Sequence, residues 1–422
     1  MGRLLIHNGR VVDPSQGLDR ITHLLIEDGR IADIDVEASG DCQVLDATDC
    51  IVAPGLVDPH VELREPGCEE DETIETGTAA ALAGGFTSIG CLPNSEPPID
   101  TQAGVEFVRQ KAARARNINV FVVGCVSKNR EGKELAEIGT LVEAGAVAFG
   151  DAPRPIHNTD LLRRAFEYSL MFQKPIFDRP EVLELAHGGV MHEGRTSLVL
   201  GLPGIPAEAE EVAVSRDLRL AEATGGRLHL IGVSTTGAVE LIRRAKTRGV
   251  KVTASIPIAN LIFTDERLRT FDTHYKVNPP LRSADHVESC LAGVMDGTID
   301  VISSGHAPRA VEKKMRELDQ APFGMSMLEM TVALVNTHLI QPGLLDWPAV
   351  LSRMTNNAAR VLGVAKGTLR MGADADIVVI NPHARWTVDP LRMRSKSVNT
   401  PLGGAELVGR VEHVVVGGEL RF

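Results

Sequence analysis

The chain has 422 residues, a hydrophobic content of 43% and a formal net charge of −12. This length accommodates one large α/β domain and a smaller second one, because α/β barrels commonly occupy about 250 residues. Acidic and basic residues are mixed along the chain without a basic run, which excludes the type of surface that binds phosphate backbones, so we expect no nucleic-acid partner.

Cysteine spacing and hydropathy indicate the compartment. Six cysteines lie far apart, although zinc ribbons and redox motifs need two thiols a few residues apart. No uninterrupted apolar stretch reaches the ~18 residues of a membrane span, and the first residues lack the apolar region of a signal peptide. We therefore predict a cytoplasmic protein with reduced thiols and no membrane partner.

Residues 1–50 are typical of short strands joined by turns. Asn8-Gly9 and Asp28-Gly29 stand between segments rich in β-branched residues, and such pairs suit tight hairpin turns. Residues 366–422 have the same character. We predict that 1–50 and 366–422 form the two halves of a small β-sandwich domain.

Strand-like and helix-like segments alternate between these ends, which favours parallel strands joined by helices. The periodicity within one expected helix is clear, because Val239, Ile242 and Ala245 recur every three residues before Gly249. Eight strands predict a TIM (β/α)8 barrel over 51–365, with an open doubly wound sheet as the alternative. The expected strands are 51–58, 86–91, 118–126, 146–151, 174–178, 228–233, 250–256 and 299–304.

A motif follows the first expected barrel strand. Residues 54–67 read PGLVDPHVELREPG, and His60 and Glu62 project from one face because strand residues alternate. The motif resembles the first-strand signature of the amidohydrolase superfamily. Residues 64–67 narrow the resemblance to dihydroorotases, whose usual pattern is His-x-His before Leu-Arg-x-Pro-Gly. Further segments that resemble this family appear in family order: LPN, GGVMHEG, LGLPGIP, GVST, KVNPPLR, DGTIDVI, HAP and APFG.

The resemblance implies a metal site at the carboxyl ends of the strands. Its ligands would be the His-x-His pair, an aspartate or carboxylated lysine after strand four, histidines after strands five and six, and an aspartate after strand eight that is also the general base. This sequence differs at most of these positions, which carry His60, Glu62, Asp151, Arg179, Gly232 and Gly305 in that order.

These replacements predict that the metal site is lost. A catalytic zinc needs about three protein ligands, and the guanidinium of Arg179 has no lone pair to offer. We therefore predict no cofactor, no metal ligand and no catalytic residue. We also expect Arg179 to occupy the place of the metal, with its guanidinium between Glu62 and Asp151.

Positions that the resemblance assigns to the substrate are better kept. Arg64 and Asn94 match residues that hold the carboxylate of dihydroorotate, and Asn278 matches another substrate contact, whereas Arg309 replaces a histidine of that pocket. The two asparagines could equally be loop residues that cap backbone groups. Residues 310–320 form a charged run with helical propensity, which suits either a solvated surface or an interaction element.

The kept and lost positions together resemble the inactive dihydroorotase homologues that support aspartate carbamoyltransferase. The function predicted here is a non-catalytic, structural subunit in pyrimidine biosynthesis. It would bind the catalytic subunit of aspartate carbamoyltransferase in a hetero-oligomer, with contacts between copies of this chain. Two alternatives remain: an active cyclic amidohydrolase with one metal on His60, Glu62 and Asp151, and a metabolite-binding module that uses the three substrate-side residues.

Overall fold

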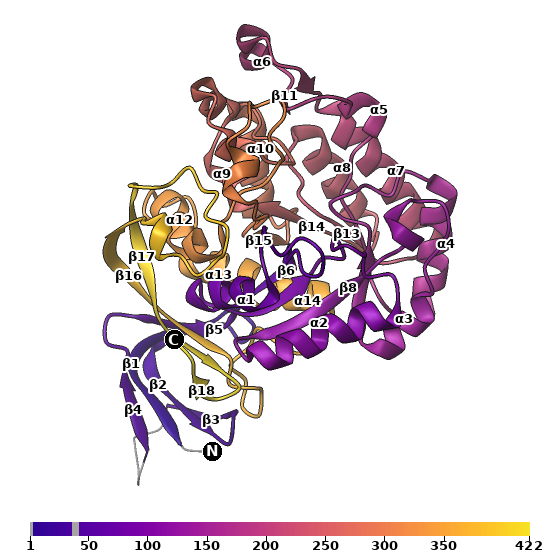
Figure 1. The fold of residues 1–422 in the computed structure, drawn as a ribbon. Helices are drawn as coiled ribbons and strands as arrows, with labels where there is room; N and C mark the ends of the chain where they lie inside the picture. The colour runs from indigo at the N-terminus through magenta and orange to yellow at the C-terminus, as the bar shows by residue number, and fades with distance from the viewer. Residues whose placement is uncertain (1–2, 36–41) are drawn as a thin grey trace.

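The computed structural model describes residues 3–35 and 42–422 and has two parts. A parallel β-barrel surrounded by helices forms the larger part, and a β-sheet built from both chain ends lies beside it (Figure 1). The predicted TIM barrel with a terminal β domain is therefore confirmed, and the open-sheet alternative is wrong.

The terminal sheet joins the two ends of the chain through β5, which pairs with β1 on one side and with β16 on the other. Its order is β18-β17-β16-β5-β1-β2-β3, with β4 beside β1. The strands are β1 (Leu4–Asp13), β2 (Leu18–Glu27), β3 (Arg30–Ile34), β4 (Gln43–Asp46), β5 (Ile51–Pro54), β16 (Ile377–Thr387), β17 (Glu406–Val416) and β18 (Glu419–Leu420).

Two local expectations about this sheet differ in outcome. Asp28-Gly29 does form the turn between β2 and β3, and both residues have positive φ. Asn8-Gly9 instead lies inside β1, where the register with β2 shifts between Ile6 and Gly9. A positive φ at Asn8 therefore produces an irregularity within a strand rather than a hairpin.

All eight barrel strands run parallel to their neighbours, and each overlaps a predicted strand. They are β6 (Leu56–Val61), β7 (Phe86–Cys91), β8 (Asn119–Gly124), β9 (Ala146–Gly150), β10 (Ile176–Asp178), β13 (Leu228–Leu230), β14 (Val252–Pro257) and β15 (Val301–Ser303). The first begins at Leu56 rather than Ile51, because 51–54 belong to the terminal sheet.

A buried carboxylate closes the barrel between its first and last strands. Asp58 on β6 accepts hydrogen bonds from the backbone N–H and the hydroxyl of Ser304, at 2.8 and 2.5 Å. Four residues after Asp58, the Glu62 N–H donates to the carbonyl of His306 at 3.3 Å. Side-chain and backbone contacts thus hold β15 against β6.

The helices cover the outside of the barrel and bury one apolar face each. In α8 (Thr236–Thr247) this face comprises Ala238, Val239, Ile242 and Ala245, as the spacing predicted. The other covering helices are α1 (Ile74–Ala83), α2 (Gln102–Ala115), α3 (Ile138–Ala144), α4 (Thr159–Leu170), α7 (Glu208–Thr224), α10 (Ala284–Met295), α13 (Trp347–Met354) and α14 (Asn356–Leu362). None of the helices within 3–35 and 42–422 is long and apolar enough to cross a membrane.

Three long connections follow strands of the second half of the barrel. The connection after β10 contains α5 (Leu183–Ala186), β11 (Met191–His192), α6 (Arg195–Leu200) and β12 (Gly204–Ile205), and α6 projects at the top of Figure 1. The connection after β14 contains α9 (Ile258–Ile262) and two 3-10 turns, and the one after β15 contains α11 (Val311–Lys314) and α12 (Thr331–Val335).

Candidate functional site

A cavity of about 70 Å³ lies at the carboxyl ends of the barrel strands. Five of the six predicted metal-site positions line it, namely His60, Glu62, Arg179, Gly232 and Gly305. Most of the remaining wall is apolar and includes Leu92, Ile231, Pro257, Val277, Met325 and Met327. This is the place where barrel enzymes carry their chemistry.

His60 is held by hydroxyl and carboxylate neighbours on the barrel floor. Its Nε2 lies 2.7 Å from the hydroxyl of Ser255 on β14, and its Nδ1 lies 3.9 Å from Asp58. The ring is also 5.8 Å from the ring of His229. Burial lowers the pKa of His60, and burial together with the charge of His60 lowers the pKa of His229 well below its ordinary value. Both imidazoles are therefore neutral at pH 7.

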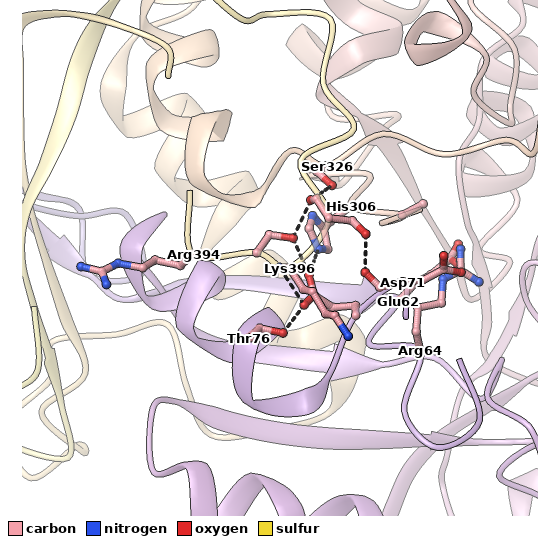
Figure 2. A network of polar contacts seen from close by, with 12 residues as sticks. Glu62, Arg64, Asp71, Thr76, His306, Ser326, Arg394 and Lys396 are labelled. Carbon is pink, nitrogen blue, oxygen red and sulfur yellow. Dashed lines mark hydrogen bonds and ion pairs between the residues drawn. The ribbon is translucent and has the colours of Figure 1, made fainter. Parts of the chain in front are cut away.

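Glu62 faces the cavity and binds the two residues that were assigned to substrate. It forms an ion pair with Arg64 and accepts a hydrogen bond from the Asn94 side-chain amide at 2.8 Å. Figure 2 shows Glu62 and Arg64 directed towards each other. Burial alone would raise the pKa of Glu62, but Arg64, Arg309 and the Asn94 hydrogen bond outweigh it, so the pKa is lowered and the side chain is a carboxylate at pH 7.

Asp151 follows β9 but turns away from Glu62. Its carboxylate accepts hydrogen bonds from the backbone N–H groups of Val126 and Ser127 at 3.0 and 3.1 Å and from the Ser127 hydroxyl at 2.5 Å. Burial raises its pKa against these bonds. Asp151 therefore holds the loop after β8 and does not join a site with His60 and Glu62.

Arg179 does not take the position expected for it. Its guanidinium pairs with Glu181 at 3.0 Å and donates to the side-chain oxygen of Asn278. Neither Glu62 nor Asp151 is its partner, so the idea that Arg179 replaces a metal between these carboxylates is wrong. The pair forms because Glu181 stands two residues after Arg179 on the same turn of chain, with 8% of its surface exposed.

The two glycines adopt a backbone conformation that other residues rarely take. Gly232 has φ +73° and Gly305 has φ +67°. A Cβ at Gly232 would lie 2.9 Å from Cδ of Pro279, and one at Gly305 would lie 2.7 Å from Cβ of Pro257. The backbone here is thus shaped around glycine and does not merely lack the histidine and aspartate side chains.

His306 belongs to a buried polar network that the sequence did not reveal (Figure 2). Its Nε2 lies 3.7 Å from Glu72, and its Nδ1 accepts the backbone N–H of Met327 at 3.2 Å. Glu72 also accepts bonds from the hydroxyls of Thr76 and Ser395. The network connects the barrel rim to 395–397, near the C-terminal end of the chain.

Several other important residues were missed by sequence reasoning. Ser255 stands at the end of an expected strand, and Asp58 lies within the 54–67 motif, so position alone could have indicated both. Glu72 has no comparable signal, because its partners His306 and Ser395 come from distant segments. Glu181 stands two residues after Arg179, so its nearness to that guanidinium could have indicated it. Arg309, in turn, donates to the Phe323 carbonyl at 3.0 Å and lies 3.5 Å from Asp71.

The residues present do not fit a metal ion. Within the described ranges, no group of three or more His, Cys, Asp and Glu side chains could hold one. His60 is bonded to Ser255, Glu62 to Arg64 and Asn94, and Asp151 to Ser127, so the three ligands of the single-metal alternative point to different partners. The polar groups that line the cavity are the carboxylate of Glu62, the imidazoles of His60 and His306, the guanidinium of Arg179 and the amides of Asn260 and Asn278.

Comparison with known proteins identifies relatives over the whole chain. A Dihydro-orotase-like family model matches residues 49–238, and an Amidohydrolase family model matches 318–422. The chain is 49% identical to a dihydroorotase of Pelotomaculum thermopropionicum, with 99% of this chain and 98% of the relative covered. It is 46% identical to a dihydroorotase of Syntrophus aciditrophicus, with 100% and 99% covered.

Solved structures show the same fold. The L-hydantoinase of Arthrobacter aurescens superposes with a TM-score of 0.89 at 24% identity. The match covers 100% of this chain and 96% of the hydantoinase chain. The dihydropyrimidinase of Brevibacillus agri has a TM-score of 0.84 at 21% identity, with 99% and 94% covered.

These relatives correct three predictions. The non-catalytic, structural role and the statement that the chain is not an enzyme are contradicted, because relatives of nearly equal length are named dihydroorotase. The prediction of no cofactor is contradicted as well, by the match of residues 318–422 to the Amidohydrolase family model. The predictions went wrong by weighing a few ligand positions above the identity of the whole chain. The chain belongs to the dihydroorotase-like family of amidohydrolases.

Proposed function

We propose that this protein hydrolyses a cyclic amide and opens its ring in the cavity at the barrel mouth. The observation that carries the proposal is the 49% identity, over 99% of this chain, to a relative named dihydroorotase. The position of the cavity supports it, because the loops at the carboxyl ends of barrel strands supply the chemistry in this fold.

The cavity residues have properties that suit a small cyclic amide. Leu92, Ile231 and Met327 provide apolar contact area, and such surfaces commonly bury most of a small ligand. Glu62, a carboxylate at pH 7, and His60, a neutral imidazole, are groups at the cavity that could accept a proton. We derive no step through a metal ion, because the donors described above do not converge.

A ring-opening assay tests the proposal. The purified chain is incubated with dihydroorotate, dihydrouracil and hydantoin, and loss of the ring is followed by absorbance or chromatography, alongside metal analysis of the same sample. We expect turnover of at least one ring. His60→Asn should reduce it at least tenfold, because His60 lines the cavity, whereas the exposed His187→Asn should leave it unchanged. Ring opening no faster than in buffer, with all three compounds, would overturn the proposal.

Association and location stay predictions, and we keep them as proposals. We propose contact with the catalytic subunit of aspartate carbamoyltransferase, and contacts between copies of this chain, with co-purification and solution mass as the tests. We also propose a cytoplasmic location, which the six free thiols support. A disulfide found in the protein isolated from cells would count against that location.

A further inference from the structure

The protein's own Glu62 carboxylate lies beside the cavity and is bound by a guanidinium and an amide. Glu62 lies 9% exposed among cationic groups: it pairs with Arg64, and the charges of Arg309 and Arg130 also favour its ionised form. Asn94 adds a hydrogen bond at 2.8 Å. The arrangement is therefore a built anion site, and a side chain of the protein already fills it.

The groups around the cavity leave no further cation for a bound anion. Among the residues that line it, all within the described ranges, Glu62 and Arg179 are the side chains of Asp, Glu, Lys or Arg. Arg179 is matched by Glu181 and Asn278, and Arg64 and Asn94 do not line the cavity but bind Glu62. Arg64 and Arg179 thus already have acidic partners, so a carboxylate in the cavity would have to compete with Glu62 or Glu181 for either cation.

The effect on a ligand depends on whether it is charged. A carboxylate would either lie beside Glu62, where like charges repel strongly at low dielectric, or displace Glu62 from Arg64 and Asn94 and leave it buried without partners. An uncharged ring meets neither obstacle and gains the apolar contacts of Leu92, Ile231 and Met327.

We infer that the cavity selects uncharged cyclic amides over rings that carry a carboxylate, because Glu62 occupies the anion site of Arg64 and Asn94. This inference rests on the proposed function and specifies its substrate class. Glu62 is the residue that determines this specificity, and removing its charge while keeping its shape should open the anion site to an external carboxylate.

Calorimetric titration of the full-length chain tests the inference. The probes are dihydrouracil, which is neutral, and dihydroorotate, which carries a carboxylate. The wild-type chain should bind dihydrouracil at least tenfold more tightly. In Glu62→Gln, binding of dihydroorotate should strengthen at least tenfold relative to binding of dihydrouracil. The matched control is Glu106→Gln, an exposed carboxylate on α2, which should behave as the wild type.

A second measurement needs no variant and remains decisive if Glu62→Gln does not fold. Dihydroorotate is compared with its uncharged carboxamide on the wild-type chain, so that the shape is kept and the charge removed. The carboxamide should bind at least tenfold more tightly. Equal or tighter binding of the acid overturns the inference alone, whereas failure to bind or open any ring overturns the proposed function with it.

Discussion

Arg179 illustrates how a single residue can be placed correctly along the chain and still have unexpected partners. Its buried guanidinium is balanced by Glu181, and Asn278 contacts both. Substituting one member of such a pair leaves the other charge buried without compensation. The sequence places both Arg179 and Asn278 among the site positions but cannot reveal that they contact each other, because Asn278 lies 99 residues away on another loop.

Arg179→Ala should therefore lower the free energy of unfolding by about 3 kcal/mol at pH 7, the cost of breaking a buried ion pair. Denaturant titration measures this. The double variant Arg179→Ala, Glu181→Ala should lose less than the sum of the single losses, because it leaves no unmatched charge. Additive losses would show that the two side chains do not interact.

The glycines at 232 and 305 lead to a second prediction at this scale. Restoring the aspartate that the family resemblance implies, by Gly305→Asp, should destabilise the protein by about 1–3 kcal/mol without increasing ring opening, because positive φ and contact with Pro257 oppose the side chain. Gly343→Asp is the control: φ there is +77° and a Cβ would meet nothing within 4 Å. Gly305→Asp should cost more than this control, and a gain in turnover would contradict the expectation.

At the scale of elements, two buried lysines hold the connection after β15 in place through hydrogen bonds to its backbone carbonyls. Lys276 Nζ donates to the carbonyls of Leu318 and Asp319 at 2.6 and 3.1 Å. Lys314 Nζ, on α11, donates to the carbonyls of Pro322 and Gly324 at 3.0 and 3.1 Å. The charged run 310–320 is thus not simply a solvated surface, since Lys314 is only 3% exposed.

This fastening predicts a dependence of stability on pH. Burial, helped by the charges of Arg309 and Lys276, lowers the pKa of Lys314 from 10.5 to about 7. Between pH 7 and 10 the unfolded chain therefore binds a proton that the folded chain lacks, and the free energy of unfolding rises with pH by at most about 1.4 kcal/mol per unit.

Lys314→Met should flatten that rise, as measured by denaturant titrations from pH 7 to pH 10. The control is Lys251→Met. Lys251 is an exposed lysine directly before β14, and its substitution should keep the slope of the wild type. The prediction would be contradicted if, between pH 7 and pH 10, the free energy of unfolding of the wild type fell relative to that of Lys314→Met.

The elements were largely predictable from the sequence, whereas the side-chain directions of the site were not. The barrel strands are apolar runs bounded by turn residues, and this pattern is local. The break at Gly55 between β5 and β6 was missed, because the apolar run continues through it while the hydrogen-bond partners change. Asp151 was expected beside Glu62, but its direction is set by the N–H groups of Ser127 on a neighbouring loop.

At the scale of the whole molecule, barrel and terminal sheet depend on each other, because the chain passes between them twice, at Gly55 and again between α14 and β16. β5 is the middle strand between the two chain ends, and only Gly55 separates it from β6. β16 pairs with β5 over residues 377–380, and Val378 packs against Gly85 at the foot of the barrel. Losing the C-terminal strands would therefore expose both an open strand edge and part of the barrel core.

A chain that ends at Ala365 should consequently be insoluble or lack cooperative unfolding, as judged by soluble yield and circular dichroism during heating. The control is a chain that lacks only residues 419–422. It should lose little stability, because β18 is exposed at the edge of the sheet. A soluble 1–365 chain that melts cooperatively at the temperature of the full-length protein would refute the dependence.

The arrangement of β5 between β1 and β16 also determines the order in which a newly synthesised chain can fold. The amino-terminal strands are synthesised first, yet β5 lacks a partner on its second edge until β16 (Ile377–Thr387) has been translated. Throughout the synthesis of the barrel this edge of β5 is therefore unpaired, and residues 377–380 are the ones that finally cover it.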